Sequence, residues 1–177
     1  MGLTIRQHAV VDGPAEAVWP RVADPERMLD WHPKLIAVDR TATGQVTAGE
    51  RFLLAFDKPA LGRRRQERLG QGTEKPATEA TRVTVSRVEP PLLVEYEHET
   101  VHRGITRIAV ETYELTPQGS RTRVEQVVDL SRANLPWWAR ALIGLISRIG
   151  RPVGRPDLEV LADVVRQDLE RGSAAGR

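Results

Sequence analysis

Residues able to do acid–base chemistry occur on a segment that alternates like a strand. From Leu92 to Val101, Val94, Tyr96 and His98 share one face, and three glutamates share the other. The three carboxylates are expected to point to water, which leaves Tyr96 and His98 facing inward. His98 would then act as a proton shuttle or a ligand hydrogen-bond donor, because imidazole titrates near neutrality. The alternative is a structural histidine, satisfied by hydrogen bonds at the open end of the sheet.

Two neighbouring segments add polar candidates. From Ile105 to Leu115 the faces are ambiguous, since Arg107 and Glu111 have one parity and two aliphatic residues have the other. If Arg107 and Glu111 point inward, they form a buried pair capable of acid–base work; otherwise both lie on the surface. In the next segment, Gln126 shares a face with apolar residues. It either orients a ligand or bonds to a neighbouring strand.

The sequence gives little support for other kinds of catalytic, metal or phosphate site. His32 lies close to Asp30, but residues two apart on a helix do not face each other, so Trp31 is interpreted as a lid or core residue and His32 as a secondary candidate. The chain has no cysteine, its histidines are scattered, and its glycines between 62 and 72 lack the context of a phosphate loop. A serine nucleophile elbow is also absent. We therefore expect no metal and no cofactor.

These residues are positioned by an α+β succession of elements. Ala15, Val18, Trp19 and Val22 have the spacing of one helical face. Pro20 is expected to disturb that helix, and Asp24 followed by Pro25 predicts a second short helix. Strands joined by tight turns predict an antiparallel meander; they are expected at Leu3 to Val11, Leu35 to Thr41, Glu50 to Phe56, Thr81 to Val88, Leu92 to Val101, Ile105 to Leu115 and Thr122 to Leu130.

The C-terminal part is predicted to be helical in two pieces. Residues Pro136 to Ile149 have an apolar face with two tryptophans nearby, and a helix rich in leucine and valine starts near Asp157. We expect one domain over residues 1–171 and a disordered tail over residues 172–177. A net charge of +2 is too small to indicate nucleic acid, and no run approaches the ~18 apolar residues of a membrane span. A cytoplasmic protein, either a monomer or a homodimer, is expected.

Several short motifs, taken in their order along the chain, resemble the START-like or SRPBCC superfamily, in its polyketide cyclase/dehydrase and lipid-transport branch. The resemblance spans almost the whole chain and rests on Pro14 to Trp19, Val22 to Arg27, Trp31 to Pro33, Gly49, Val88 to Pro91, Tyr113 to Pro117 with Thr122 to Val124, and Asp157 to Leu161. It implies a helix-grip fold, in which a curved antiparallel sheet grips a long C-terminal helix and two small helices close one end. Departures are the long segment Lys58 to Ala77 and the added apolar stretch Pro136 to Arg155.

The same resemblance implies an internal cavity for a lipid, polyketide or similar apolar molecule. The expected cavity residues are Trp19, Trp31, Phe52, Leu54, Phe56, Val94, Tyr96, His98, Val124, Gln126, Val128, Leu161 and Val165. The fold does not imply one activity, because it hosts carriers, enzymes and regulators.

Three functions remain open. The first is a binding or carrier protein for a hydrophobic small molecule. The second is a polyketide cyclase or aromatase-like enzyme using His98, Tyr96, Arg107 or Glu111 in the same cavity. The third is a peripheral membrane or partner-binding protein that uses the basic amphipathic stretch Pro136 to Arg151, whose apolar face otherwise packs over the sheet or a partner subunit.

Overall fold

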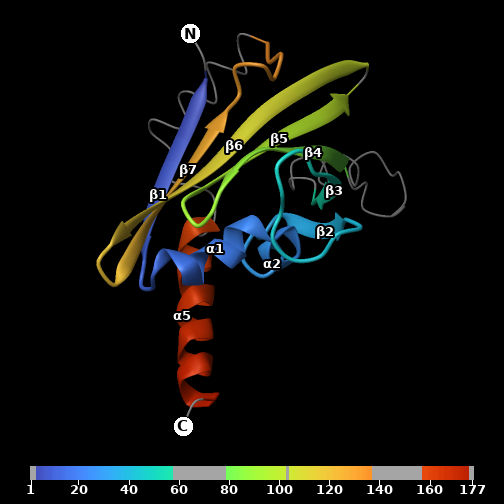
Figure 1. Ribbon diagram of the computed structural model, residues 1–177. Coiled ribbons are helices and arrows are strands. Elements are labelled where there is room, and N and C mark those ends of the chain that lie inside the picture. Colours follow the sequence, from blue (N-terminus) through green and yellow to red (C-terminus); the bar gives the residue numbers. More distant parts are fainter. Residues whose placement is uncertain (1–2, 58–78, 103, 137–156, 176–177) are drawn as a thin grey trace, which may run out of the picture.

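The computed structural model describes residues 3–57, 79–102, 104–136 and 157–175. Its centre is a seven-stranded sheet that curves around the helices (Figure 1). The segment Lys58 to Ala77 and, apart from Pro136 itself, the stretch Pro136 to Arg155 lie outside the described residues. In the described part, no helix is both long and apolar enough to cross a membrane.

The predicted meander is confirmed, and every neighbouring pair of strands is antiparallel. The spatial order is β1-β7-β6-β5-β4-β3-β2, so the N-terminal strand pairs with the last one. At the hairpin after β6, Gln118 pairs with Arg121 and Gly119 has a φ of 67°, which glycine adopts without strain. The strands are β1 (Thr4–Val11), β2 (Leu35–Asp39), β3 (Arg51–Phe56), β4 (Glu79–Glu89), β5 (Leu93–His102), β6 (Ile105–Gln118) and β7 (Arg121–Asp129).

Two short helices follow β1, as the sequence predicts. They are α1 (Ala15–Ala23) and α2 (Pro25–Met28). Pro20 lies inside α1 without ending it, and the chain changes direction at Asp24 instead. The reason is local: Pro25 disfavours helical geometry at Asp24, whose carboxylate accepts a hydrogen bond from the Glu26 amide at 3.1 Å.

The long helix α5 (Asp157–Ala175) packs against β1 and α1. The buried face of this helix carries Leu158, Leu161 and Val165. The turn before α1 approaches this helix closely, since a Cβ on Gly13 would lie 3.0 Å from Leu169 Cδ1. The helix includes residues 172–175, which were expected to belong to a disordered tail; residues 172–174 are exposed, so the helix continues past its buried positions.

Candidate functional site

Three adjacent strands bring polar side chains together on the inner face of the sheet, the face covered by the helices. In the β5–β6 register Tyr96 pairs with Glu111, and in the β6–β7 register Tyr113 pairs with Gln126. His98 is one step along β5 on the same face. The alternation predicted for β5 and β7 is thus confirmed, and the ambiguous strand β6 turns Glu111 inward, where its side chain is 13 % exposed.

Glu111 is the centre of this cluster. His98 Nε2 lies 3.0 Å from Glu111 Oε2, and the Tyr113 hydroxyl donates to Oε1 at 2.8 Å. The amide of Gln126 also donates to Oε1 and is itself bonded to Gln7. Burial raises the pKa of Glu111, but the hydrogen bond and charge of His98, with the hydrogen bonds from Tyr113 and Gln126, outweigh burial and lower this pKa to about 2. The carboxylate is therefore ionised at neutral pH.

Tyr96 is held differently from its neighbour His98. Its hydroxyl donates to the Val22 carbonyl at 2.8 Å, and only 2 % of the residue is exposed. Burial, with the nearby charge of Glu111, raises the pKa of Tyr96 far above its ordinary value. Tyr96 is thus a neutral bridge from β5 to α1, whereas His98 Nδ1 has no hydrogen-bond partner in the part of the chain that the structure describes.

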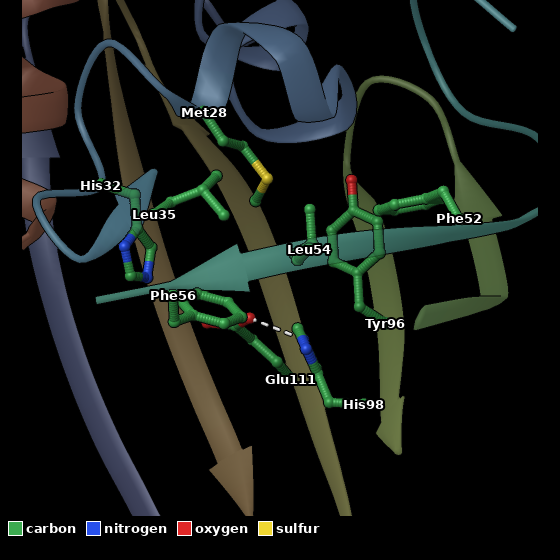
Figure 2. Close-up of a pocket in the computed structure, with 9 residues that line it drawn as sticks. All are labelled: Met28, His32, Leu35, Phe52, Leu54, Phe56, Tyr96, His98 and Glu111. Carbon is green, nitrogen blue, oxygen red and sulfur yellow. Dashed lines mark hydrogen bonds and ion pairs between the residues drawn. The ribbon is translucent and has the colours of Figure 1, made fainter. Parts of the chain in front are cut away.

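A small pocket adjoins this cluster (Figure 2). Its volume is about 10 Å³, room for about one water molecule. Its walls come from α2, the segment after it and the inner faces of β2, β3, β5 and β6. The rings of His32 and Phe56 lie 5.7 Å apart at one side. The lining residues are Met28, His32, Leu35, Phe52, Leu54, Phe56, Tyr96, His98 and Glu111.

The pocket brings together part of the predicted cavity set. Phe52, Leu54, Phe56, Tyr96 and His98 line it. None of its lining residues comes from α5, because the space between the sheet and that helix is filled by side chains. The predicted cavity residues that lie in the buried core without lining the pocket are Trp19, Trp31, Val94, Val124, Leu161 and Val165. Gln126 instead serves the Glu111 cluster, and Val128 is partly buried on β7.

Neither alternative for Arg107 and Glu111 describes them fully: Glu111 points inward, but no ion pair joins it to Arg107 in the described residues. The hydrogen-bonding partner of Glu111 is His98, a diagonal neighbour on the adjacent strand, since diagonal cross-strand positions lie closer than residues four apart along one strand. Arg107 shares the inner-face parity of Glu111, and its Nε atom is buried without a hydrogen-bond partner. It is not among the residues that line the pocket.

Sequence reasoning gave too little weight to two groups. Tyr113, which has the same parity as Glu111, was not proposed as a site residue. His32 is not paired with Asp30, which binds Arg21 instead. Its Nε2 faces Asp157 Oδ2 at 3.7 Å, and its Nδ1 is buried without a partner. No local signal reveals this arrangement, because Asp157 is distant in sequence.

The described residues contain no group of three or more side chains that could hold a metal ion. His98 and His102 are spaced four apart, but about 13 Å separates such positions in an extended strand, too far for one ion.

Solved structures share this architecture at low sequence identity. A crystal structure of protein CV1439 from Chromobacterium violaceum has a TM-score of 0.59 at 18% identity, covering 92% of this chain and 96% of that one. A solution structure from Arthrobacter aurescens has a TM-score of 0.62 at 16% identity, with 93% and 87% covered. CalU16 from Micromonospora echinospora has a TM-score of 0.52 at 16% identity, with 96% and 80% covered.

These likenesses establish the fold. A search among curated proteins gave no match. A family model, however, matches residues 3–173, almost the whole chain, and it agrees with the resemblance seen in the short motifs. The chain therefore belongs to the family described as polyketide cyclase/dehydrase and lipid transport.

Proposed function

We propose that the protein binds a hydrophobic small molecule in the pocket beside His98 and Glu111. The observation that carries this proposal is a mostly apolar pocket with an ionised carboxylate–imidazole pair at one end. Binding sites for small molecules combine apolar walls with a few well-placed polar groups in this way. Membership in the family described as polyketide cyclase/dehydrase and lipid transport also supports a hydrophobic ligand.

The polar cluster is hard to explain by stability alone. Taking a carboxylate out of water is costly, and buried ion pairs can often be replaced by apolar residues without loss of stability. Here the Glu111 carboxylate and the His98 ring are each less than 15% exposed and still reach the pocket. A ligand-anchoring role accounts for a carboxylate hydrogen-bonded to an imidazole at this position.

A ligand larger than water requires the lining to move. The pocket holds about 10 Å³, so an aromatic or aliphatic guest must displace side chains. Phe56 is half-buried at the end of β3, and Met28 is an unbranched side chain with three rotatable bonds. We assign the adjustment to these two residues, because β3 and β5 are each hydrogen-bonded to a neighbouring strand on both sides.

A second candidate function is acid–base catalysis in the same pocket. Glu111 orients His98 through Nε2 and leaves Nδ1 able to exchange a proton with a bound molecule. Of the residues proposed as catalytic from the sequence, only this pair has the geometry; Tyr96 is bonded to the backbone and Arg107 does not contact Glu111. A cyclase or aromatase-like reaction would rest on His98.

Native mass spectrometry of the purified protein tests ligand binding. We expect a co-purifying apolar molecule, identified after organic extraction, and we expect Leu54→Phe to reduce its occupancy by filling the pocket. Leu53→Phe is the matched control, because Leu53 lies next to it on the outer face and is 39% exposed. Empty wild-type protein that also fails to take up added apolar compounds would overturn the proposal, as would full occupancy in Leu54→Phe.

A further inference from the structure

The pocket has an unusual balance of hydrogen-bonding groups. Among its nine lining side chains, nitrogen or oxygen atoms occur on His32, Tyr96, His98 and Glu111. Tyr96 carries the one hydroxyl of this set, and that hydroxyl already donates to the Val22 carbonyl at 2.8 Å. No lining hydroxyl is therefore left to donate to a ligand.

Glu111 keeps capacity to accept. Its Oε1 receives hydrogen bonds from Tyr113 and Gln126, but its Oε2 contacts only His98 Nε2. A carboxylate oxygen accepts about two hydrogen bonds, so Oε2 has one position unused. Because an ionised carboxylate only accepts, His98 Nε2 carries the hydrogen of this contact.

His32 supplies a second acceptor to the pocket lining. Its Nε2 faces the Asp157 carboxylate at 3.7 Å, which favours the hydrogen on that nitrogen. Nδ1 is then an acceptor, and it is buried with no partner. A buried acceptor left unpaired costs free energy, so a ligand that supplied a donor here would gain from pairing it.

We propose that the pocket selects neutral ligands that carry a hydroxyl or another hydrogen-bond donor and discriminates against carboxylates. This inference rests on the proposed function and names its ligand class. A hydroxyl matches the unused acceptors of Glu111 and His32. A carboxylate would lie beside the negative charge of Glu111 and find no free O–H among the lining side chains, which leaves its own charge unpaired. The low pKa of Glu111 keeps that negative charge in place at neutral pH.

Three small probes of similar shape separate the alternatives at pH 7. They are 4-ethylphenol, which donates; 4-ethylanisole, which has no donor; and 4-ethylbenzoate, which is an anion. Dissociation constants come from NMR titration of the Met28 and Leu54 methyl signals, which report on the pocket itself. We expect the phenol to bind at least about tenfold more tightly than either other probe, the effect of one hydrogen bond to a charged group.

Each possible result for the wild-type protein supports or overturns one of the proposals. Equal binding of the phenol and the anisole would overturn this inference and keep the proposed function. Tighter binding of the benzoate would also overturn it and would point to Arg107, whose Nε is buried without a partner on the same face. Failure of all three probes to shift the pocket signals would overturn both proposals. In a folded Glu111→Gln variant we expect the preference for the phenol to shrink, whereas Glu114→Gln, an exposed position on the outer face, should retain it.

Discussion

Replacement of Glu111 by glutamine should remove a pH-dependent part of the protein's stability. The Glu111 pKa falls from an ordinary 4.5 to about 2 in the folded protein. At about 1.4 kcal/mol for each pKa unit, this corresponds to about 3 kcal/mol of unfolding free energy near pH 7. Because the folded-state pKa lies below the unfolded one, the contribution is complete above about pH 5 and is lost as the pH falls from 4.5 toward 2.

Urea unfolding of wild type and Glu111→Gln between pH 7 and pH 3 measures this contribution. We expect the variant to be less stable by about 3 kcal/mol at pH 7, and the difference to shrink by about 2 kcal/mol at pH 3. Glu114→Gln makes the same chemical change on the exposed face of β6 and should leave the wild-type pH profile nearly unchanged. A wild-type-minus-Glu111→Gln difference that stays constant with pH would refute the argument, as would greater stability of Glu111→Gln at pH 7.

Three further predictions concern the frame around the site. Leu161→Ala, at a fully buried position, should cost about 2–5 kcal/mol in thermal or urea unfolding, whereas Leu169→Ala, 40% exposed, should cost much less; equal losses would contradict the packing of α5. Tyr96→Phe should lose about 1 kcal/mol of stability and bind the three probes as tightly as wild type, since its hydroxyl donates to a backbone carbonyl. A loss of probe affinity would show that Tyr96 contributes to binding. Arg21→Met should cost about 1–2 kcal/mol by unpairing Asp168, and an unchanged unfolding midpoint would show that the α1–α5 bridge contributes nothing.

The alternation of polar and apolar residues along the strands predicted much of the fold. On β5, three outward glutamates correctly indicated that Tyr96 and His98 face inward. On β6, the rule failed to decide, because inward positions include Glu111 and Arg107 while outward positions include half-buried aliphatic residues. Only the register with β5, which pairs Tyr96 with Glu111, settles that strand.

The site itself depends on contacts that sequence spacing does not encode. His32 contacts Asp157, which lies far from it in the sequence, and His98 contacts Glu111 because β5 pairs with β6. The resemblance to the family predicted the sheet, the helices and a cavity. It placed that cavity against the C-terminal helix, whereas the pocket adjoins α2 and β2, because Leu161 and Val165 fill the space beneath α5.

A crystal structure of the purified protein, loaded with the molecule that mass spectrometry identifies, tests the central claim most directly. The account predicts density for that molecule against Phe52 and Leu54, with a polar atom within hydrogen-bond distance of His98 or Glu111. Density for the molecule elsewhere, with these side chains unmoved and the pocket no larger than one water, would contradict it.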